Sequence, residues 1–189
     1  NQRDRIPGRI VLADLEDDTW QASLARNYDA ITIVNSTIGS TATGGTSLLS
    51  AGAVNVLGSS FVGNSTAPLT VATGLFNVNA ATVLGNQTSV TANNLRVAGG
   101  ASLVGTNVLR ADIAQNVVVD AATGNSSVVG SNAVNMTLYS ADSILALGTA
   151  AGTGMAAIRT GGVDGVIRVF FPRRASGGLF VDGVAGVGP

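Results

Sequence analysis

The chain has no cysteine, no histidine and no lysine among its 189 residues. Without cysteine, disulfides and thiolate chemistry are impossible, and without histidine as well the usual zinc ligands and the Ser-His-Asp and Cys-His nucleophilic sites are excluded. Without lysine, the Gly-Lys-Ser/Thr end of a phosphate-binding P-loop cannot occur. These absences exclude most enzyme classes, and we expect no cofactor, no metal and no catalytic residue.

Charged and aromatic side chains are also scarce. Only 11% of the residues are charged, 4% are aromatic, and the formal net charge is −1, which gives no basis for binding nucleic acid. The sequence has no apolar run of the length, about 18 residues, that a membrane span needs. Because the chain begins at Asn1, we expect a processed chain or a fragment of a longer protein.

Small, apolar and uncharged polar residues make up most of the sequence. It is 46% hydrophobic and holds 25 glycines, so its polar surface must consist of Asn, Ser and Thr. Val and Thr favour strands, whereas Gly and Asn tolerate the positive φ angles of tight turns. The composition therefore predicts an all-β fold in one domain.

Charge divides the chain into three parts. Residues 1–29 hold four arginines and six acidic residues, residues 30–155 hold two arginines and three aspartates, and residues 156–189 hold four arginines and two aspartates. We therefore expect an N-terminal cap or docking segment, a nearly uncharged central part, and a C-terminal hairpin or docking segment with these boundaries.

The central part repeats itself. Residues 53–64 read AVNVLGSSFVGN, residues 75–86 read LFNVNAATVLGN and residues 94–106 read NLRVAGGASLVGT, with looser copies at residues 117–124 and 133–148. A unit of about 20 residues cannot close a core alone, but stacked as one turn of a solenoid it buries its inward side chains against its neighbours. We predict a β-solenoid of five or six such turns over residues 30–155, with a β-sandwich as the alternative.

Alternation of apolar residues within the copies predicts which side chains face the core. The three clearest copies also share a glycine near their ends, at Gly63, Gly85 and Gly105, and the intervals of 22 and 20 residues between these glycines set the length of the repeat. The predicted inward positions are Val54, Val56, Phe61, Leu75, Val78, Val83, Leu95, Val97, Leu103, Val117, Val119, Val134, Met136 and Ile144.

The N-terminal segment, residues 1–29, allows two local structures. Residues 17–19 are typical of the cap of a short helix that would carry Trp20, Leu24 and Tyr28. Residues 8–13 read equally well as a strand. In either case we expect this segment to cap the first turn or to join a neighbouring molecule.

The C-terminal segment, residues 156–189, returns to β signals. The tetrapeptide VDGV occurs at residues 163–166 and 181–184, and Asp-Gly between apolar residues indicates a hairpin turn. Phe170 and Phe171 lie on opposite faces of a strand predicted over residues 166–171. One of the two rings therefore needs cover from something beyond the core.

The cysteine-free, degenerate repeats over residues 53–148, rich in Asn, Thr, Val, Ala and Gly, resemble the β-helices of filamentous haemagglutinin-type exoproteins and autotransporter passengers. The resemblance is one of period and composition. It implies a right-handed β-solenoid that is secreted across a bacterial outer membrane and has a role in adhesion, biofilm or surface structure. It brings no catalytic motif, and this chain is far shorter than such passengers.

Carboxylates are the remaining candidates for chemistry, because glycoside hydrolysis needs two that face each other. In the central part these are Asp112, Asp120 and Asp142. The interval from Asp112 to Asp142 is not a whole number of the predicted turns, so we expect these two on different faces. Solvated or capping roles are the simpler interpretation.

The ends of a solenoid expose unpaired backbone groups, which are templates for another chain. Since the first segment is acidic and the last is basic, the sequence predicts head-to-tail self-association, which gives a filament if it does not close into a ring. The residues expected at this interface are Glu16, Asp17, Asp18, Trp20, Arg168, Phe170, Phe171, Arg173 and Arg174.

The function predicted from the sequence is that of a secreted bacterial surface protein with a structural or adhesive role. The alternatives are a glycan-binding module or phage fibre segment and a β-helical polysaccharide-active enzyme. Glycan binding needs an aromatic platform, and Trp20, Tyr28 and Tyr139 offer little of one. The expected partners are further copies of the chain and surface glycans of a host or a bacterium.

Overall fold

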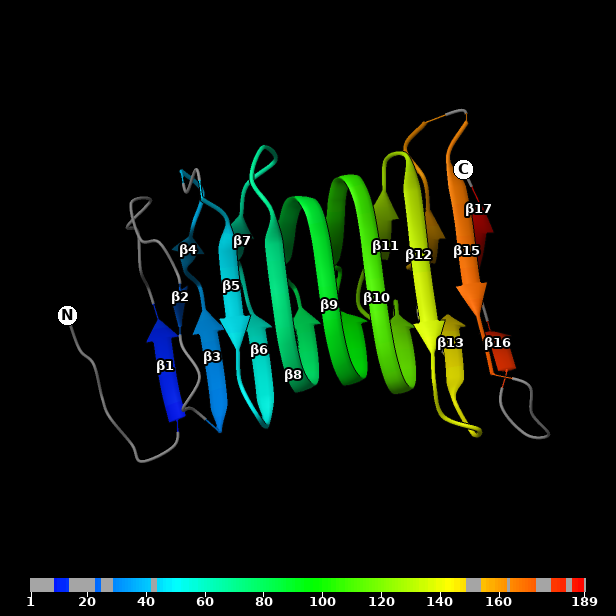
Figure 1. The fold of residues 1–189 in the computed structure, drawn as a ribbon, viewed down its shortest axis with the longest axis horizontal. Coiled ribbons are helices and arrows are strands. Elements are labelled where there is room, and N and C mark those ends of the chain that lie inside the picture. The colour runs from blue at the N-terminus through cyan, green and yellow to red at the C-terminus, as the bar shows by residue number, and fades with distance from the viewer. Residues whose placement is uncertain are drawn as a thin grey trace.

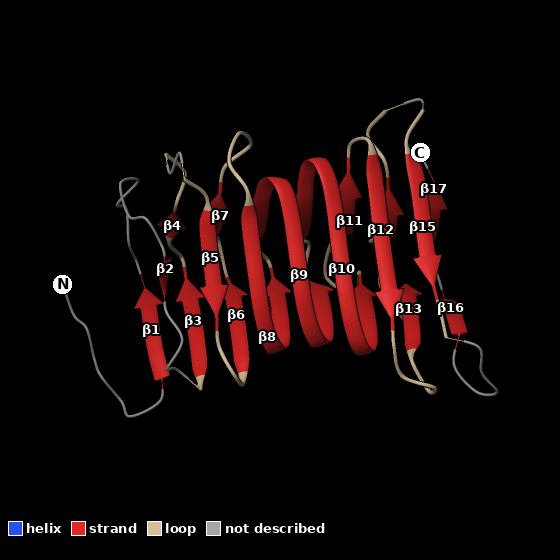
Figure 2. Cartoon of the chain, viewed as in Figure 1, coloured by secondary structure: helices blue, strands red, loops and turns tan. Residues whose placement is uncertain are grey.

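The computed structural model describes residues 9–13, 23–24, 29–41, 44–148, 154–162, 164–172, 178–182 and 185–188. All regular secondary structure within these ranges consists of β-strands (Figure 2). The strands wind into a β-solenoid whose turns follow one another along the long axis of the molecule (Figure 1). The all-β solenoid predicted from the sequence is confirmed.

The strands form because apolar side chains alternate with polar or small ones. In β6 (Ala53–Leu57), the sequence AVNVL buries Val54 and Val56 completely and leaves Asn55 on the outer side. Burying an aliphatic side chain of this size stabilises the fold by about 1.5–3 kcal/mol. Since most strands of the solenoid repeat this pattern, their inward side chains join into one continuous apolar core.

Each turn of the solenoid has three faces, and each face is a ladder of parallel strands. Face 1 consists of β4 (Thr37–Ile38), β7 (Phe61–Gly63), the start of β9 (Thr82–Ala98), the start of β10 (Ser102–Asp120), β11 (Ser126–Gly130), β14 (Ala156–Arg159) and β17 (Ala185–Gly188). Face 2 consists of β2 (Ser23–Leu24), β5 (Thr46–Leu49), the first part of β8 (Leu69–Asn79), the middle of β9 and of β10, β12 (Ala133–Leu138) and β15 (Val166–Phe170). Face 3 consists of β1 (Arg9–Ala13), β3 (Ala30–Val34), β6, the second part of β8, the ends of β9 and β10, β13 (Ile144–Gly148) and β16 (Gly178–Asp182).

The chain visits faces 1, 2 and 3 in the same order in successive turns. In the middle of the molecule β9 and β10 each run through all three faces as one long, bent strand (Figure 1). Five consecutive turns that include all three faces lie between residues 37 and 148. The solenoid therefore also includes strands outside residues 30–155, since β1 pairs with β3 at one end and β14 to β17 continue the ladders at the other.

Turn length increases towards the C-terminal end. Leu75 of β8 pairs with Asn94 of β9, whereas Ala133 of β12 pairs with Val166 of β15, which is a much longer interval along the chain. The predicted repeat of about 20 residues, at the short end of the range for solenoid units, holds for the central turns. The longer turns place their extra residues in loops between faces, because the paired segments keep similar lengths.

Most of the predicted inward positions are buried, but three of them are wrong. Leu75 and Ile144 are each 37% exposed and point outward, and Phe61 is only partly buried on the outer side of face 1. Each has an apolar neighbour one position later, and that neighbour takes the inward position instead. These core residues are Val62, Phe76 and Leu145. A period of two does not distinguish the sides of a strand where two adjacent residues are apolar.

Glycines mark the corner between faces 1 and 2 in the later turns. Gly85, Gly105 and Gly130 are paired in register, whereas Gly63 is paired with Leu84 and so lies one position out of this column. A Cβ atom on Gly105 or Gly130 would collide with the carbonyl oxygen of the residue three positions later. Only glycine fits at this close approach of two backbone segments.

For the N-terminal segment the sequence predicted either a strand or a short helix, and its described residues form strands. Residues 9–13 form β1, as the strand interpretation predicted. Leu24 belongs to β2, so the helical interpretation is wrong at that residue. The other positions of the predicted helix, residues 17–20 and Tyr28, lie outside the described residues.

The C-terminal strands replace the predicted hairpin. Strands β14 to β17 pair in parallel with earlier turns instead of with one another in an antiparallel hairpin. The first Asp-Gly pair, Asp164-Gly165, lies at a corner between two faces of the solenoid. The C-terminal segment therefore continues the solenoid.

Candidate functional site

Three residues predicted for an assembly interface lie in the final described turn, on or next to β15. Arg168 and Phe170 are exposed on the outer side of face 2, and the Phe170 side chain is 56% exposed. Phe171 follows the strand and packs, partly buried, against the core. The structure thus separates the two rings as predicted. The other predicted interface residues fall outside the described residues, namely Glu16, Asp17, Asp18, Trp20, Arg173 and Arg174.

Among the described residues, no strand pairs with β15 or β16 on the side away from the preceding turn. The inward side chains of β12, such as Met136, have 1% or less of their surface exposed. The residues that continue their columns in and after β15, Ile167, Val169 and Phe171, are only partly buried. On face 3, Leu145 is 1% exposed, but its partner Leu179 in β16 is 51% exposed. Apolar surface that is covered in the preceding turn is therefore accessible here.

The backbone N–H groups of β15 pair with a neighbouring strand on one edge only, among the described residues. The Val166 N–H donates to the Asn132 carbonyl oxygen at 3.0 Å, so this peptide group faces β12. Successive peptide groups of a strand point to opposite sides, and the N–H groups of Ile167 and Val169 therefore point away from β12. Among the described residues, β15 pairs with β12 alone.

A second cluster of functional side chains lies on the outer side of face 2, around Asp112 of β10. The Arg110 Nε donates to Asp112 Oδ2 at 2.7 Å, and the Tyr139 hydroxyl donates to Asp112 Oδ1 at 3.1 Å. Hydrogen bonding to the carboxylate, with its negative charge, raises the pKa of the Tyr139 hydroxyl and that of the Arg110 guanidinium above their usual ranges. The arginine and the aspartate balance each other in charge, and the hydrogen bond orients Tyr139, a residue that is 59% exposed.

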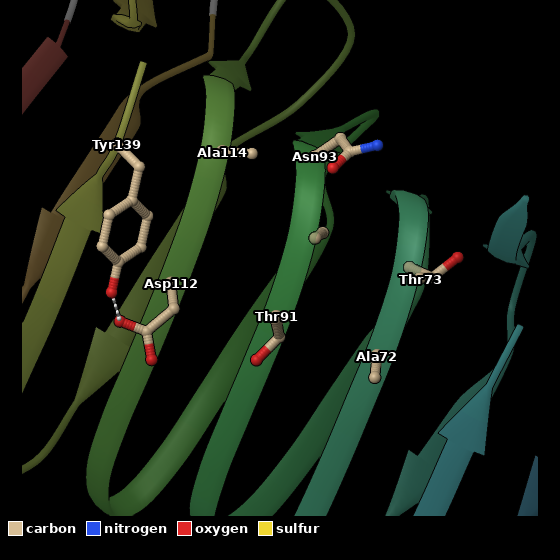
Figure 3. Close-up of a pocket in the computed structure, with 8 residues that line it drawn as sticks. Ala72, Thr73, Thr91, Asn93, Asp112, Ala114 and Tyr139 are labelled. Carbon is tan, nitrogen blue, oxygen red and sulfur yellow. Dashed lines mark hydrogen bonds between the residues drawn. The ribbon is translucent and has the colours of Figure 1, made fainter. Parts of the chain in front are cut away.

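A groove with a volume of about 420 Å³ runs beside this ring across four turns of the solenoid (Figure 3). Its lining residues come from equivalent positions of β8, β9 and β10 and from the loop that follows β12. They are Ala72, Thr73, Thr91, Ala92, Asn93, Asp112, Ala114 and Tyr139. The groove therefore combines small side chains with hydroxyl, amide and carboxylate groups and one aromatic ring.

The other central carboxylates lie elsewhere. Asp120, at the end of β10, accepts a hydrogen bond from Arg96 at 3.2 Å and another from the Ala122 N–H at 2.9 Å. Asp142 lies in the loop between β12 and β13. Among the described residues no three carboxylates gather in a group able to hold a metal ion. Asp112 and Asp120 each form an ion pair with an arginine, an arrangement typical of carboxylates that stabilise a fold.

The Asp112 cluster was only faintly indicated by the sequence. Tyr139 was recognised as one of a few aromatic residues, and its contact with Asp112 crosses 27 positions of the chain. One usable signal is scarcity: Arg110 and Asp112 are two of only five charged residues between positions 30 and 155. Alternate residues of a strand lie on the same side, so a strand at these positions would have put the pair on one face, but that strand was not predicted from the sequence.

No protein-family model, no curated protein and no solved structure matches this chain. Within the part of the chain that the structure describes, no helix has the length and apolar character to cross a membrane.

Proposed function

We propose that the chain is a rod-shaped, secreted bacterial surface protein with a structural or adhesive role. Rods lengthen when the first turn of one copy covers the final turn of another. The observation that carries the proposal is the exposure of core-facing side chains at the C-terminal end. Ile167, Val169, Phe171 and Leu179 continue buried columns of the core, but among the described residues no further turn covers them on the side away from the preceding turn.

The topology supports a contact in which each face continues into the same face of the next copy. At the N-terminal end β1, β2 and β4 are the first described strands of faces 3, 2 and 1, and each pairs with a later turn only. At the C-terminal end β16, β15 and β17 are the last strands of the same three faces. Head-to-tail contact would join three parallel ladders at once.

Charge supports the same orientation. Residues 1–29 include more acidic residues than arginines, and residues 156–189 include more arginines than aspartates. Opposite charges attract unlike ends and like charges oppose contact between two C-terminal ends. Because exposed charges are screened by salt over about 8–10 Å, this contribution weakens at high ionic strength.

A proline at residue 169 tests the contact directly. Val169→Pro removes an N–H that points to the free edge and leaves the bonds to β12 intact, because Val166, Arg168 and Phe170 face that strand. Val169→Ala is the matched control, since it shortens the same side chain but keeps the N–H. Circular dichroism and urea unfolding establish that both variants are folded.

Sedimentation velocity and negative-stain microscopy over a range of concentrations then measure assembly. We expect the wild-type chain to form rods that lengthen with concentration and shorten in high salt, Val169→Ala to form them at a higher concentration, and Val169→Pro to stay monomeric. Monomers of the wild-type chain under every condition contradict the proposal, and so does assembly that stops at a dimer. Antibody labelling of intact source cells tests surface exposure, and label seen only after permeabilisation contradicts it.

A further inference from the structure

The groove beside Tyr139 has features that the assembly of rods does not use. It lies on the outer side of the solenoid, near the corner of faces 2 and 3, and its lining residues come from strands in the middle of the molecule and from the loop after β12 (Figure 3). End-to-end contact leaves this surface open. From its geometry we infer that the groove is a binding site for an uncharged carbohydrate, with Tyr139 as the surface on which a sugar ring packs.

The groove is shaped by the residues that occupy one register position in successive turns. Ala72, Thr91 and Asp112 are register partners in successive turns, and the row continues to Thr137. Small residues in the earlier turns leave a hollow, and the Tyr139 ring forms a wall on the C-terminal side (Figure 3). Strands are spaced about 4.8 Å apart, so four turns span roughly 14 Å, which accommodates more than one sugar unit.

Tyr139 is held in place before any ligand arrives. An exposed tyrosine normally samples several rotamers, but here its hydroxyl is bonded to Asp112, which Arg110 holds from the other side. An aromatic ring that is already ordered loses little side-chain entropy when a ligand packs on it. Tyr139 is oriented by this bond and more than half of the residue is exposed, so its ring is suited to contact the apolar C–H face of a pyranose.

The polar groups of the groove match the hydroxyl groups of a sugar. Thr91 offers a hydroxyl that donates and accepts, Asn93 offers an amide that does both, and the Asp112 oxygens keep further acceptor sites beyond their two bonds. The Thr73 hydroxyl donates to the Leu75 carbonyl oxygen at 3.4 Å and can still accept. Because Arg110 balances Asp112, the site has no net charge to attract an ion. This balance favours an uncharged glycan over an acidic one.

The inference is tested with an array of neutral and acidic oligosaccharides, followed by calorimetry with the best neutral binder. We expect a neutral hexose or N-acetylhexosamine oligosaccharide to bind with a Kd below about 1 mM, which corresponds to weak but specific binding. Tyr139→Ala should weaken this binding at least tenfold. Tyr139→Phe keeps the ring but loses the bond to Asp112, and should weaken binding by a smaller factor.

Two controls separate this site from other effects. Phe61→Ala removes an aromatic ring from the outer side of face 1 and should leave binding unchanged. Val169→Pro should also bind normally, so failure of assembly and failure of carbohydrate binding are distinguishable. The inference is overturned if no neutral glycan binds, if acidic glycans bind more tightly, or if a folded Tyr139→Ala variant binds like the wild-type chain.

Discussion

The central turns and the final turn of the solenoid are built on the same pattern but differ in how completely that pattern is buried. In β9 and β10 a turn lies on either side, and inward residues such as Leu103, Leu109 and Ile113 have no exposed surface. In β15 the inward residues Ile167 and Val169 continue the columns of Leu109 and Ala111 and remain partly exposed. Alternation places a side chain on the inward side, but burial requires a neighbouring turn above and below it.

Stability is also distributed unevenly between the central turns and the final turn. In a solenoid each turn interacts mainly with its two neighbours, so an end turn has about half the interface of a central one. Loops in the later turns are longer as well, since more of the chain separates paired positions of β12 and β15 than separates those of β8 and β9. Longer loops carry a slightly higher closure entropy. We therefore expect local opening to begin at the final turn.

The largest contrast is expected from the same substitution in the two regions. Ile113→Ala in β10 removes a completely buried side chain, and we expect a loss of about 3 kcal/mol in the free energy of unfolding. Ile167→Ala in β15 should cost about 1 kcal/mol, because that side chain is only partly buried. Urea unfolding of monomeric protein measures both values. Equal losses would mean that the final turn is as well covered as the centre.

A central corner should be almost as sensitive as the central core. Gly130→Ala places a Cβ atom against the Ala133 carbonyl oxygen, and the backbone shift that relieves the contact should cost about 1–3 kcal/mol. Gly44→Ala is the matched control because nothing lies within 4 Å of the added atom, and it should change stability by less than about 0.5 kcal/mol. Thermal unfolding compares the two, and similar melting temperatures would contradict the corner geometry.

Outward ion pairs should matter much less than inward contacts in the same turns. Arg96 and Asp120 are joined at 3.2 Å, but their side chains are 44% and 28% exposed. Arg96→Gln should therefore cost no more than about 1 kcal/mol, and less in high salt. A loss that approaches that of Ile113→Ala, measured by the same urea unfolding, would show that the central faces depend on surface charge.

The smallest effect on stability is expected at Tyr139, where a spectroscopic measurement is more sensitive. Its raised pKa results from the bond to Asp112, so Asp112→Asn should lower the pKa of this tyrosine towards about 10. The protonated hydroxyl is the bonded form. The stabilisation is therefore complete below the unfolded-state pKa of about 10 and is lost as the pH rises through the folded-state pKa. Ultraviolet titration in a Tyr28→Phe background measures the shift, and an unchanged titration curve would contradict the hydrogen bond.

Much of the fold was predictable because it depends on local alternation. Val54, Val56, Leu95 and Val97 were placed correctly in the core from the period of two alone. Where two apolar residues are adjacent, as at Leu75 and Phe76, the sequence did not distinguish the inward one. The choice depends on the register with the turns on each side, which one copy of the repeat does not contain.

The candidate site was less predictable, since it depends on contacts across turns of unequal length. Turns of equal length do not bring Tyr139 to Asp112, because β10 pairs with β12 across a longer stretch of chain than β9 does with β10. The final turn was predicted as a docking segment from its charge and its two phenylalanines. Its parallel strands were not predicted, because Asp-Gly sequences fit a solenoid corner as well as a hairpin turn.

Hydrogen exchange at the free edge of β15 is the most direct test of the central claim that another copy covers the final turn. The N–H groups of Ile167 and Val169 point away from β12, so they exchange rapidly in a monomer and become protected when another strand pairs with them. The account predicts that the protection of these two amides rises with protein concentration, while protection in β9 and β10 stays constant. Protection at Ile167 and Val169 that is independent of concentration would contradict it.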